Sequence, residues 1–537
     1  MAWLGLSTER LNQSDMKRWS VVVFLLGHFG LFAQPGVLDN SFSSDGIIVL
    51  PGFSDNTYVS EVRWTQNGKV LCAGTSRNGN NTNIFLVRLL ESGEMDMSFG
   101  ISGSIQTSFG FEQASCKGME LQADGKIVLI GSVNQNGNES SMVVRLNSDG
   151  GMDHPFGTGG ILVLDIGYSL ESFLDLQLLP NGNIICLGRV HSVSPQLSLI
   201  RVDIDGNVDV AFGNNGQVIS SISQDHILPY SCAVDYGGSI LVSGARITNG
   251  GAKPIVLKYS QDGVLDEGFG DGGVLFSDFA TYNNDFQDIA INVDGSYLVV
   301  GESADSGGGQ GDILIARFYS NGEIDSSFSE DGYFKLDLFG FPDAAQQLLI
   351  QQDNKVLVGG TTISQVGSEY PEQFALARLN PDGSLDNSFG IGGYIATGFV
   401  LNGQWAGLES MNFQADGKIL AAGYVNNGQV NPVVARFISG INIGIGEVDT
   451  YIGSTLVYPN PITNNQIRVE YELKADETVS IDLFDLTGKL ISQLQSSVDE
   501  KAGPYQKTLS LPNVSAGNYL LKLNTEKGSV SVKLTVN

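Results

Sequence analysis

Basic residues are scarce in this chain of 537 residues, which has 29 Lys and Arg against 58 Asp and Glu and a formal net charge of −29. A field of that sign repels phosphate backbones and anionic lipid headgroups. We therefore expect no nucleic-acid partner, and a ligand that is neutral or cationic.

Long stretches of the helix formers Ala, Glu and Lys are also missing, whereas Gly is abundant, with 68 residues. Hydrophobic residues make up 42% of the chain and charged residues 16%, so it can bury a core. Glycine-rich turns between short apolar runs are typical of strands joined by tight turns. We expect an all-β protein.

The first 33 residues have the pattern of a secretory signal peptide. Lys17 and Arg18 precede an apolar run of about fourteen residues that ends at Ala33. A transmembrane helix needs roughly twenty apolar residues, and Pro35 follows this run closely. We expect residues 1–33 to be removed on export, with no transmembrane span in the mature chain; Met16 is an alternative start of translation.

The middle of the chain consists of seven sequence repeats. The motif G-x-[LMIV]-D-x-x-F-[GS] recurs every 56 to 61 residues, with its aspartate at Asp39, Asp96, Asp153, Asp209, Asp266, Asp325 and Asp386. A turn and an almost continuous apolar strand end at Gly74, Gly131, Gly188, Gly244, Gly301, Gly360 and Gly423. A third strand carries one basic residue, at Arg88, Arg145, Arg201, Lys258, Arg317, Arg378 and Arg436.

Repeats of this length, with about four short strands each, favour blades arranged radially. We expect a seven-bladed β-propeller of four-stranded blades over residues 34–440. The two motifs resemble those of the delta-60 repeat family, which implies the same fold and brings no catalytic residues; Ser43 and Ser329 depart from its pattern, because each replaces the Gly after Phe.

The order of the elements predicts how the propeller closes. Asp39 opens the array without a preceding basic strand, and Arg436 ends it without a following L-D motif. Because a closed ring leaves no open edge, we expect Gly46–Leu50 to pair, antiparallel, with the strand that contains Arg436.

A different pattern begins at about residue 455, after a linker over residues 441–454. Apolar residues alternate with polar ones, as in Val530 to Val536, which indicates a small immunoglobulin-like β-sandwich. The segments YPNP, IDLFDLTGKLI, SAGNYLLKL and SVSVKLTVN resemble the C-terminal sorting domain of the type IX secretion system. The resemblance implies that residues 455–537 engage that machinery, and that the protein is released from, or attached to, the surface of a gram-negative bacterium.

The repeated acidic and basic residues are interpreted as structural, because seven equal copies favour an ion pair inside each blade. Asp203 to Asp209 looks superficially like a calcium loop, but residue 214 is Asn where an EF-hand has Glu, so we interpret the segment as an ordinary turn. No cofactor is expected, and calcium is the one metal left open.

The chain has few cysteine and histidine residues that could form a metal site or a catalytic site. Cys72, Cys116, Cys186 and Cys232 occupy slots that predict no disulfide. The histidines of the mature chain, His154, His191 and His226, fall in three different units. Neither a zinc site nor a Ser-His-Asp triad is expected, and we predict no catalytic residues.

Aromatic residues gather in the loops before the first strand and between the second and third strands of each unit. We expect these loops to share one face, and binding residues concentrate on loops held by a rigid scaffold. The predicted ligand face carries Tyr58, Phe111, Tyr168, Tyr230, Tyr282, Phe286 and Trp405. The alternative is that these side chains merely fill the rims of neighbouring blades.

Three function classes remain open. The first is a non-enzymatic exported binding protein for a glycan or a protein, which we expect. The second is a structural or adhesive surface protein without a discrete pocket. The third is a polysaccharide-active enzyme, which would need paired carboxylates flanking a glycosidic bond.

Overall fold

The computed structural model of the chain describes residues 35–440 and 456–536, with short gaps of which 166–170, 221–225, 305–310, 398–404 and 459–465 are among the longest. The predicted signal peptide and linker lie outside the described residues. All 36 elements of the described chain are β-strands, which confirms the all-β prediction. No described segment forms a helix that is long and apolar enough to span a membrane.

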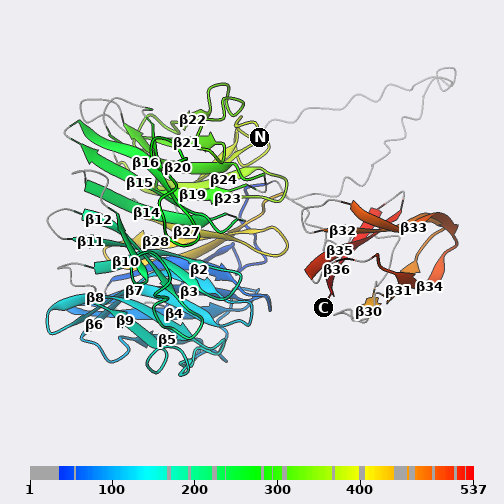
Figure 1. Cartoon of the computed structure of the whole chain (residues 1–537), viewed down its shortest axis with the longest axis horizontal. Helices are drawn as coiled ribbons and strands as arrows, with labels where there is room; N and C mark the ends of the chain where they lie inside the picture. Colours follow the sequence, from blue (N-terminus) through cyan, green and yellow to red (C-terminus); the bar gives the residue numbers. More distant parts are fainter. Residues whose placement is uncertain are drawn as a thin grey trace, which may run out of the picture. The chain divides into compact units, whose positions relative to one another are not determined.

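Residues 36–440 fold as consecutive antiparallel units, each with strands A to D (Figure 1). Strand A is β2 (Asn56–Trp64), β6 (Gln113–Leu121), β10 (Glu171–Leu178), β14 (His226–Val234), β19 (Asp288–Ile291), β23 (Asp343–Ile350) and β27 (Trp405–Phe413). Strand B is β3 (Val70–Asn78), β7 (Ile127–Gln135), β11 (Ile184–His191), β15 (Ile240–Thr248), β20 (Tyr297–Ala304), β24 (Val356–Ile363) and β28 (Ile419–Asn426). In unit 5 a two-residue strand, β18 (Asn283–Asn284), also pairs with β20.

Strand C is β4 (Asn81–Leu89), β8 (Asn138–Leu146), β12 (Pro195–Val202), β16 (Gly251–Tyr259), β21 (Asp312–Phe318), β25 (Glu372–Leu379) and β29 (Val430–Phe437). Strand D follows strand C in units 1 to 6, as β5 (Ser104–Thr107), β9 (Ile161–Leu164), β13 (Gln217–Ser220), β17 (Val274–Phe276), β22 (Tyr333–Leu336) and β26 (Tyr394–Thr397). Strands D are short, and strands B and C are mostly buried. The core therefore lies between the sheets, along strands B and C.

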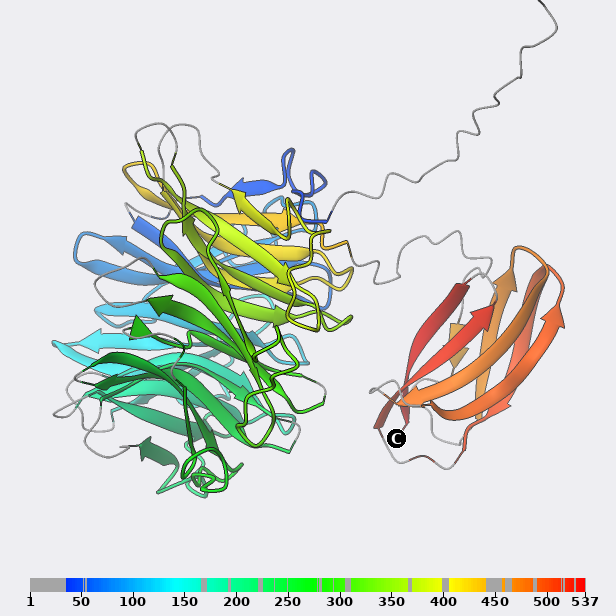
Figure 2. The same cartoon turned by 90° about the horizontal axis from the view of Figure 1, so that it is seen from above.

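The amino-terminal strand completes the carboxy-terminal unit. β1 (Ile47–Val49) pairs antiparallel with β29, with Ile48 opposite Val434, as expected for Gly46–Leu50. A parallel bridge between Asn56 and Val430 joins this sheet to that of unit 1. Figure 2 shows the yellow strands of the last unit beside the blue strands of the first.

The glycine that ends the apolar run of strand B is required by a close approach between strands. Six of the seven A–B pairs shift register at a bulge in strand A, as between Cys116 and Gly118 in β6. A Cβ atom on Gly131 would lie 1.9 Å from the carbonyl oxygen of Ser115. Any side chain here would therefore force β7 away from the bulge.

The repeated basic residue of strand C binds the repeated aspartate. In the units with Arg, its Nε atom lies 2.6 to 2.7 Å from Oδ2 of the aspartate, and its guanidinium lies 4.4 to 5.0 Å from the centre of the Phe ring of the same motif. The same geometry joins Arg436 to Asp39 and Phe42, so residues from opposite ends of the described repeats form one cluster.

The same side chain also binds the next unit. In every unit a terminal nitrogen donates to the backbone carbonyl two residues after the next strand C; the pairs are Arg88–Ser148, Arg145–Ile204, Arg201–Gln261, Lys258–Ser320, Arg317–Pro381, Arg378–Ser439 and Arg436–Glu91. The last of these runs from unit 7 to unit 1. The basic side chain of each unit thus binds the motif aspartate of its own C–D turn and the backbone of the C–D turn in the next unit.

A lysine of the A–B turn adds a second cation in some units. The lysine Nζ atom lies 2.7 to 3.3 Å from the motif aspartate in the pairs Lys69–Asp96, Lys126–Asp153, Lys355–Asp386 and Lys418–Asp39.

Burial alone would raise the pKa of Asp325, but hydrogen bonds from Ser327 and Tyr319 and the charge of Arg317 lower it to about 2.

The four cysteines are free and buried. Cys72 and Cys186 lie in strands B, Cys116 and Cys232 in strands A. Burial raises the pKa of the Cys116 thiol to about 12, so these thiols are inert core residues.

Residues 456–536 form two further sheets, drawn orange to red in Figure 2. One contains β30 (Leu456–Tyr458), β31 (Gln466–Leu473) and β34 (Gly503–Ser510). The other contains β33 (Leu490–Glu500), β32 (Glu477–Asp485), β35 (Gly517–Thr525) and β36 (Gly528–Val536). A single core, with Val469, Ile481 and Leu523, joins both sheets.

We predict that Arg436→Ala destabilises the repeat region by about 3–5 kcal/mol, because removing one partner of a buried pair leaves the other charge uncompensated. The side chains of Arg436 and Asp39 are 2% and 8% exposed. The control is Lys501→Ala, whose partner Asp476 is exposed; its effect on stability should be far smaller, because water screens an exposed ion pair. Chemical denaturation measures both, and equal effects would contradict the assignment.

We also predict that acid weakens the repeat region through the ion pair of Asp325 and Arg317. The folded-state pKa of Asp325 lies below that of an unfolded aspartate, so its pair contributes stability above pH 4 that is lost as the pH falls through about 2. Asp325→Asn should lower the unfolding temperature at pH 6 and have little effect at pH 2. A constant difference across this range would show that the charge is not the cause.

Candidate functional site

The bulge of strand A places one residue of each unit at equivalent positions. In six units this residue follows the bulge, and in all seven it pairs with the residue before the strand-B glycine, as Asp175 pairs with Leu187 and Asp288 with Val300. The seven positions are Glu61, Gly118, Asp175, Ser231, Asp288, Gln347 and Ser410. We call them the inner ring.

Inner-ring side chains bind the backbone of the next unit. Asp175 accepts a hydrogen bond from the Cys232 N–H at 2.7 Å, and Asp288 accepts one from the Leu348 N–H at 2.8 Å. Gln347 binds the N–H of Met411 in the same way. The inner ring therefore ties strands A together from one unit to the next.

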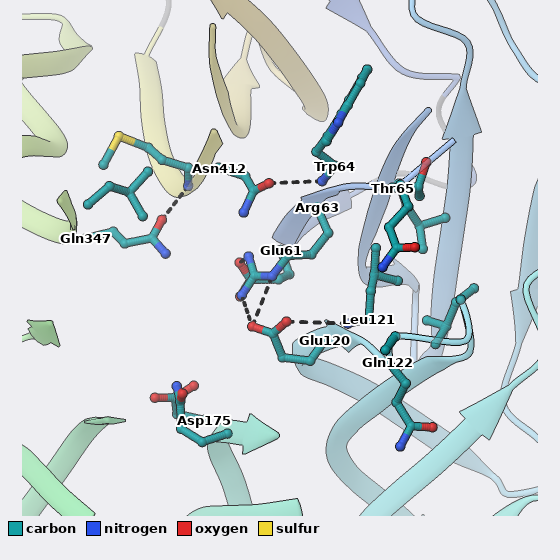
Figure 3. A pocket seen from close by; sticks show the side chains of 18 of the residues that line it. Glu61, Arg63, Trp64, Thr65, Glu120, Leu121, Gln122, Asp175, Gln347 and Asn412 are labelled. Carbon is teal, nitrogen blue, oxygen red and sulfur yellow. Dashed lines mark hydrogen bonds and ion pairs between the residues drawn. The ribbon is translucent and has the colours of Figure 1, made fainter. Parts of the chain in front are cut away.

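The tie also runs from unit 7 to unit 1. Ser410 Oγ accepts a hydrogen bond from the Val62 N–H at 3.2 Å and donates one to Glu61. Two residues along the strands, Asn412 accepts a hydrogen bond from the Trp64 N–H at 3.0 Å, as Figure 3 shows.

One arginine lies between two carboxylates beside the inner ring. Arg63 Nη2 lies 2.8 Å from Glu120 Oε1, and its other terminal nitrogen binds Glu61 (Figure 3). A planar guanidinium can satisfy two carboxylates at once, which a lysine ammonium does less well. The side chains of Glu61, Arg63 and Glu120 are 15%, 15% and 28% exposed, so water still reaches them.

These side chains line a pocket of about 690 Å³, which we call the central pocket. All seven units contribute to it: Glu61, Glu120, Asp175, Ser231, Asp288, Gln347 and Met411 are among its lining residues. The A–B turns of units 1 and 2 form part of its wall, with Thr65 to Asn67 and Gln122 to Gly125. The volume is that of an ordinary small-ligand site.

The central pocket favours protonated carboxyl groups. Burial raises the pKa of Glu61 to about 7 although Arg63 and Ser410 oppose the shift. Burial also raises the pKa of Asp175, against hydrogen bonds from Cys232 and Ser231. The lining has two arginines, of which Arg88 is bound to Asp96 outside the lining. The pocket carboxylates therefore outnumber the cations that face them, and a cationic or hydrogen-bond-donating ligand would relieve the excess.

A second pocket, of about 420 Å³, is lined mostly by strands A and B of units 1 and 2, with Ser172 of unit 3 and Glu409 of unit 7. Tyr58, Lys117 and Glu409 are among its lining residues, and Tyr58 packs edge to face on Tyr424 with ring centres 5.8 Å apart. Burial raises the pKa of Glu409 to about 7, and the charge of Lys117 opposes the shift.

The structure separates the residues of the predicted ligand face. Trp405 is 53% exposed, Tyr58 lines the second pocket, and Tyr230 and Phe111 are partly buried. Phe111 packs on the core between units 1 and 2, as the rim-filling alternative has it. Tyr168 and Tyr282 lie outside the described residues.

Phe286 corrects the prediction. Its side chain is fully buried in the core of unit 5, against Phe279 and Phe318. The same core contains Leu241 and Val256 of unit 4, so Phe286 lies between two units rather than on a loop surface. A ligand cannot reach it.

No metal centre is evident in the described part of the chain, where no three His, Cys, Asp or Glu side chains gather closely enough to hold an ion. The calcium-like segment is a turn, in which Asp203 Oδ1 accepts hydrogen bonds from the N–H groups of Asp205 and Asn207. Asp209 binds Arg201 instead.

Sequence reasoning missed the inner ring, although a signal was present. Each of its residues lies thirteen positions before the strand-B glycine of its unit, as Glu61 does before Gly74. Aligning the repeats on that glycine would have shown acidic, amide or hydroxyl side chains at this position in six of the seven units.

Comparison with known families agrees with this architecture. The model of the DUF5122 β-propeller, a domain of unknown function, matches residues 65–99, 122–156, 294–328, 351–389 and 414–438, and that of a secretion-system C-terminal sorting domain matches residues 456–537. The chain carries DUF5122 propeller repeats and a type IX sorting domain. The sorting domain implies secretion or attachment at the cell surface through the type IX machinery.

Solved structures resemble the DUF5122 chain only distantly. Semaphorin 2a of Drosophila is 8% identical, with a TM-score of 0.42, and the match covers 94% of this chain and 99% of that one. The polysaccharide lyase Uly1 is 10% identical, with a TM-score of 0.45 and 75% and 96% covered. These TM-scores are too low to support an inference about function, and a search of curated proteins found no match.

We predict that Arg63→Gln lowers stability more at pH 8 than at pH 5. Without Arg63, Glu61 loses its cation, and its folded-state pKa rises further above that of an unfolded glutamate. A raised carboxyl pKa gives stability at low pH that is lost as the pH rises through it. Thermal unfolding at both pH values measures the effect, and an equal loss at both would contradict it.

Proposed function

We propose that the DUF5122 repeats close into a seven-bladed propeller, and that the exported protein is a non-enzymatic binding protein whose ligand occupies the central pocket. The observation that carries the proposal is the pocket's lining, to which all seven units contribute. Because each unit supplies part of the lining, a pocket of this kind forms only when all seven units are assembled in the ring. The immunoglobulin-like sandwich at the C-terminus serves export.

The lining favours a polyhydroxylated ligand, for which a glycan is the leading class. Sugar hydroxyl groups both donate and accept, and the pocket offers carboxylates such as Glu120, the guanidinium of Arg63 and the amides of Gln122 and Asn412. The indole of Trp64 lies in the same wall and provides a rigid apolar surface. The net charge of −29 disfavours polyanions.

The proposal is tested by affinity electrophoresis of the mature protein in laminarin, mannan, chitosan and alginate. We predict retardation by a neutral or cationic polymer and none by alginate. Gln122→Ala and Asn412→Ala should each weaken binding about tenfold, the scale of one lost hydrogen bond to a bound ligand. Asp416→Ala, on the equivalent turn of unit 7 and outside the pocket lining, is the control.

The loop face predicted from the sequence is the second candidate site. The observation that favours it is the pocket lined by Tyr58, Lys117 and Glu409, together with the exposed indole of Trp405. Aromatic residues give rigid contact area. If Tyr58→Ala and Trp405→Ala weaken binding while Gln122→Ala and Asn412→Ala do not, the ligand site is this face.

The enzyme class needs carboxylates that are free to act on a glycosidic bond. Those of the central pocket are engaged: Glu61 and Glu120 bind Arg63, and Asp175 and Asp288 bind neighbouring backbone. We therefore expect no release of reducing ends from the same polysaccharides. If the wild type releases reducing ends steadily and Glu61→Gln does not, the protein is an enzyme rather than a binding protein. If none of the polysaccharides binds, the structural or adhesive class is favoured.

A further inference from the structure

A serine hydroxyl in the central pocket lies between two carboxylates. Ser231 Oγ is 3.0 Å from Asp175 Oδ2 and 2.8 Å from Asp288 Oδ1, both within hydrogen-bond distance. A hydroxyl group has one proton, and an ionised carboxylate has none. If both aspartates were ionised, the Ser231 hydroxyl could donate its proton to only one of them. The other carboxylate oxygen would then face the Ser231 oxygen with no proton between the two atoms.

We propose that Asp175, Ser231 and Asp288 hold one additional proton and act as a pH-sensitive clasp between units 3, 4 and 5. In the closed clasp the Asp288 carboxylic acid donates to Ser231 Oγ, and the Ser231 hydroxyl donates to Asp175. The clasp concerns the protein without ligand, so it does not depend on the proposed function.

The remaining hydrogen bonds decide which aspartate carries the proton. Asp175 Oδ1 accepts the Leu176 N–H at 2.7 Å, and its Oδ2 accepts the Cys232 N–H at 2.7 Å. Both of its oxygens are thus acceptors of backbone donors, which stabilises the anion. Asp288 Oδ2 accepts the Leu348 N–H, and the carboxyl also receives a backbone hydrogen bond from Ile289. Its Oδ1 is the oxygen that faces Ser231, at 2.8 Å, and we place the proton there.

The surrounding charges favour retention of that proton. Arg63 of β2 is bound by Glu61 and by Glu120 of β6, and these two carboxylates add negative charge near Asp175. The other titratable groups nearby are the buried thiols of Cys186 and Cys232, on β11 and β14, while β23 presents Leu348 and the uncharged Gln347. Burial raises the pKa of Asp288 to about 7.

Loss of the proton would place two anions on one hydroxyl and weaken the contact between β14 and β19. Because the folded-state pKa of Asp288 is raised, the clasp contributes stability that is complete at low pH and lost as the pH rises through about 7. The clasp is therefore closed in mildly acidic surroundings and open in alkaline ones.

The first test compares unfolding of the mature protein between pH 5 and 8.5. Asp288→Asn keeps an acceptor for Leu348 and a donor for Ser231 and cannot titrate. Between pH 5 and 7 the unfolding constant of the wild type should rise, relative to the variant, by up to tenfold per pH unit, the value for one proton. Asp124→Asn, an exposed carboxylate on the same pocket wall, should follow the wild type.

The second test is needed in case Asp288→Asn does not fold. Infrared spectra of the protein with carbon-13 aspartate should show a protonated aspartate at pH 6 and its loss at pH 8.5. Because burial also raises the pKa of Asp343, to about 6, the spectra are compared in the Asp343→Asn background. The band should remain in that variant and vanish when Asp288→Asn is added. No protonated band in the wild type, or one that disappears with Asp343, would overturn the clasp, as would equal pH slopes in the first test.

Discussion

The guanidinium at the end of strand C is the contact on which the repeats depend. In one position it neutralises the motif aspartate, covers the motif phenylalanine and holds the backbone of the next unit; Arg145 does this with Asp153, Phe156 and Ile204. A buried ion pair of this kind fixes geometry more reliably than it adds stability. Here it joins successive sheets through one hydrogen bond to the backbone of the next unit.

Because the contacts of the strand-C cation connect one unit to the next, the residues at the inner-ring positions of strands A are free to vary. Inner-ring positions hold Gly118 in unit 2, Ser231 in unit 4 and carboxylates in units 1, 3 and 5, although each of them pairs with the residue before the strand-B glycine. The polar side chains bind across to the next strand, and the space they leave is the central pocket. A constant frame with a variable lining is how one fold supports many sites.

Much of the fold could be predicted from the sequence, because the repeats are regular. The L-D-x-x-F motif, the basic strand and the strand-B glycine each have one structural cause, and the pairing of Gly46–Leu50 with β29 followed from counting which element lacked a partner. The separate sorting domain was equally clear, because its four segments are specific.

The site was predicted less well, for a physical reason. Aromatic residues in loops were taken as ligand contacts, but a loop residue next to a strand can turn into the core, as Phe286 does at 0% exposure. The polar residues of the central pocket lie in strands, where alternation makes them look like ordinary solvent-facing positions. Their convergence depends on how the units pack together, which the sequence of a single unit does not reveal.

Closure of the ring is tested most directly by a disulfide between Val49→Cys and Val433→Cys, which are opposite each other in the β1–β29 pair. The native cysteines are buried and free, so they compete little. If the amino-terminal strand completes the last unit, oxidation of the mature protein should link peptides from the two ends of the repeats. Free thiols at both positions in a folded, oxidised protein would contradict closure.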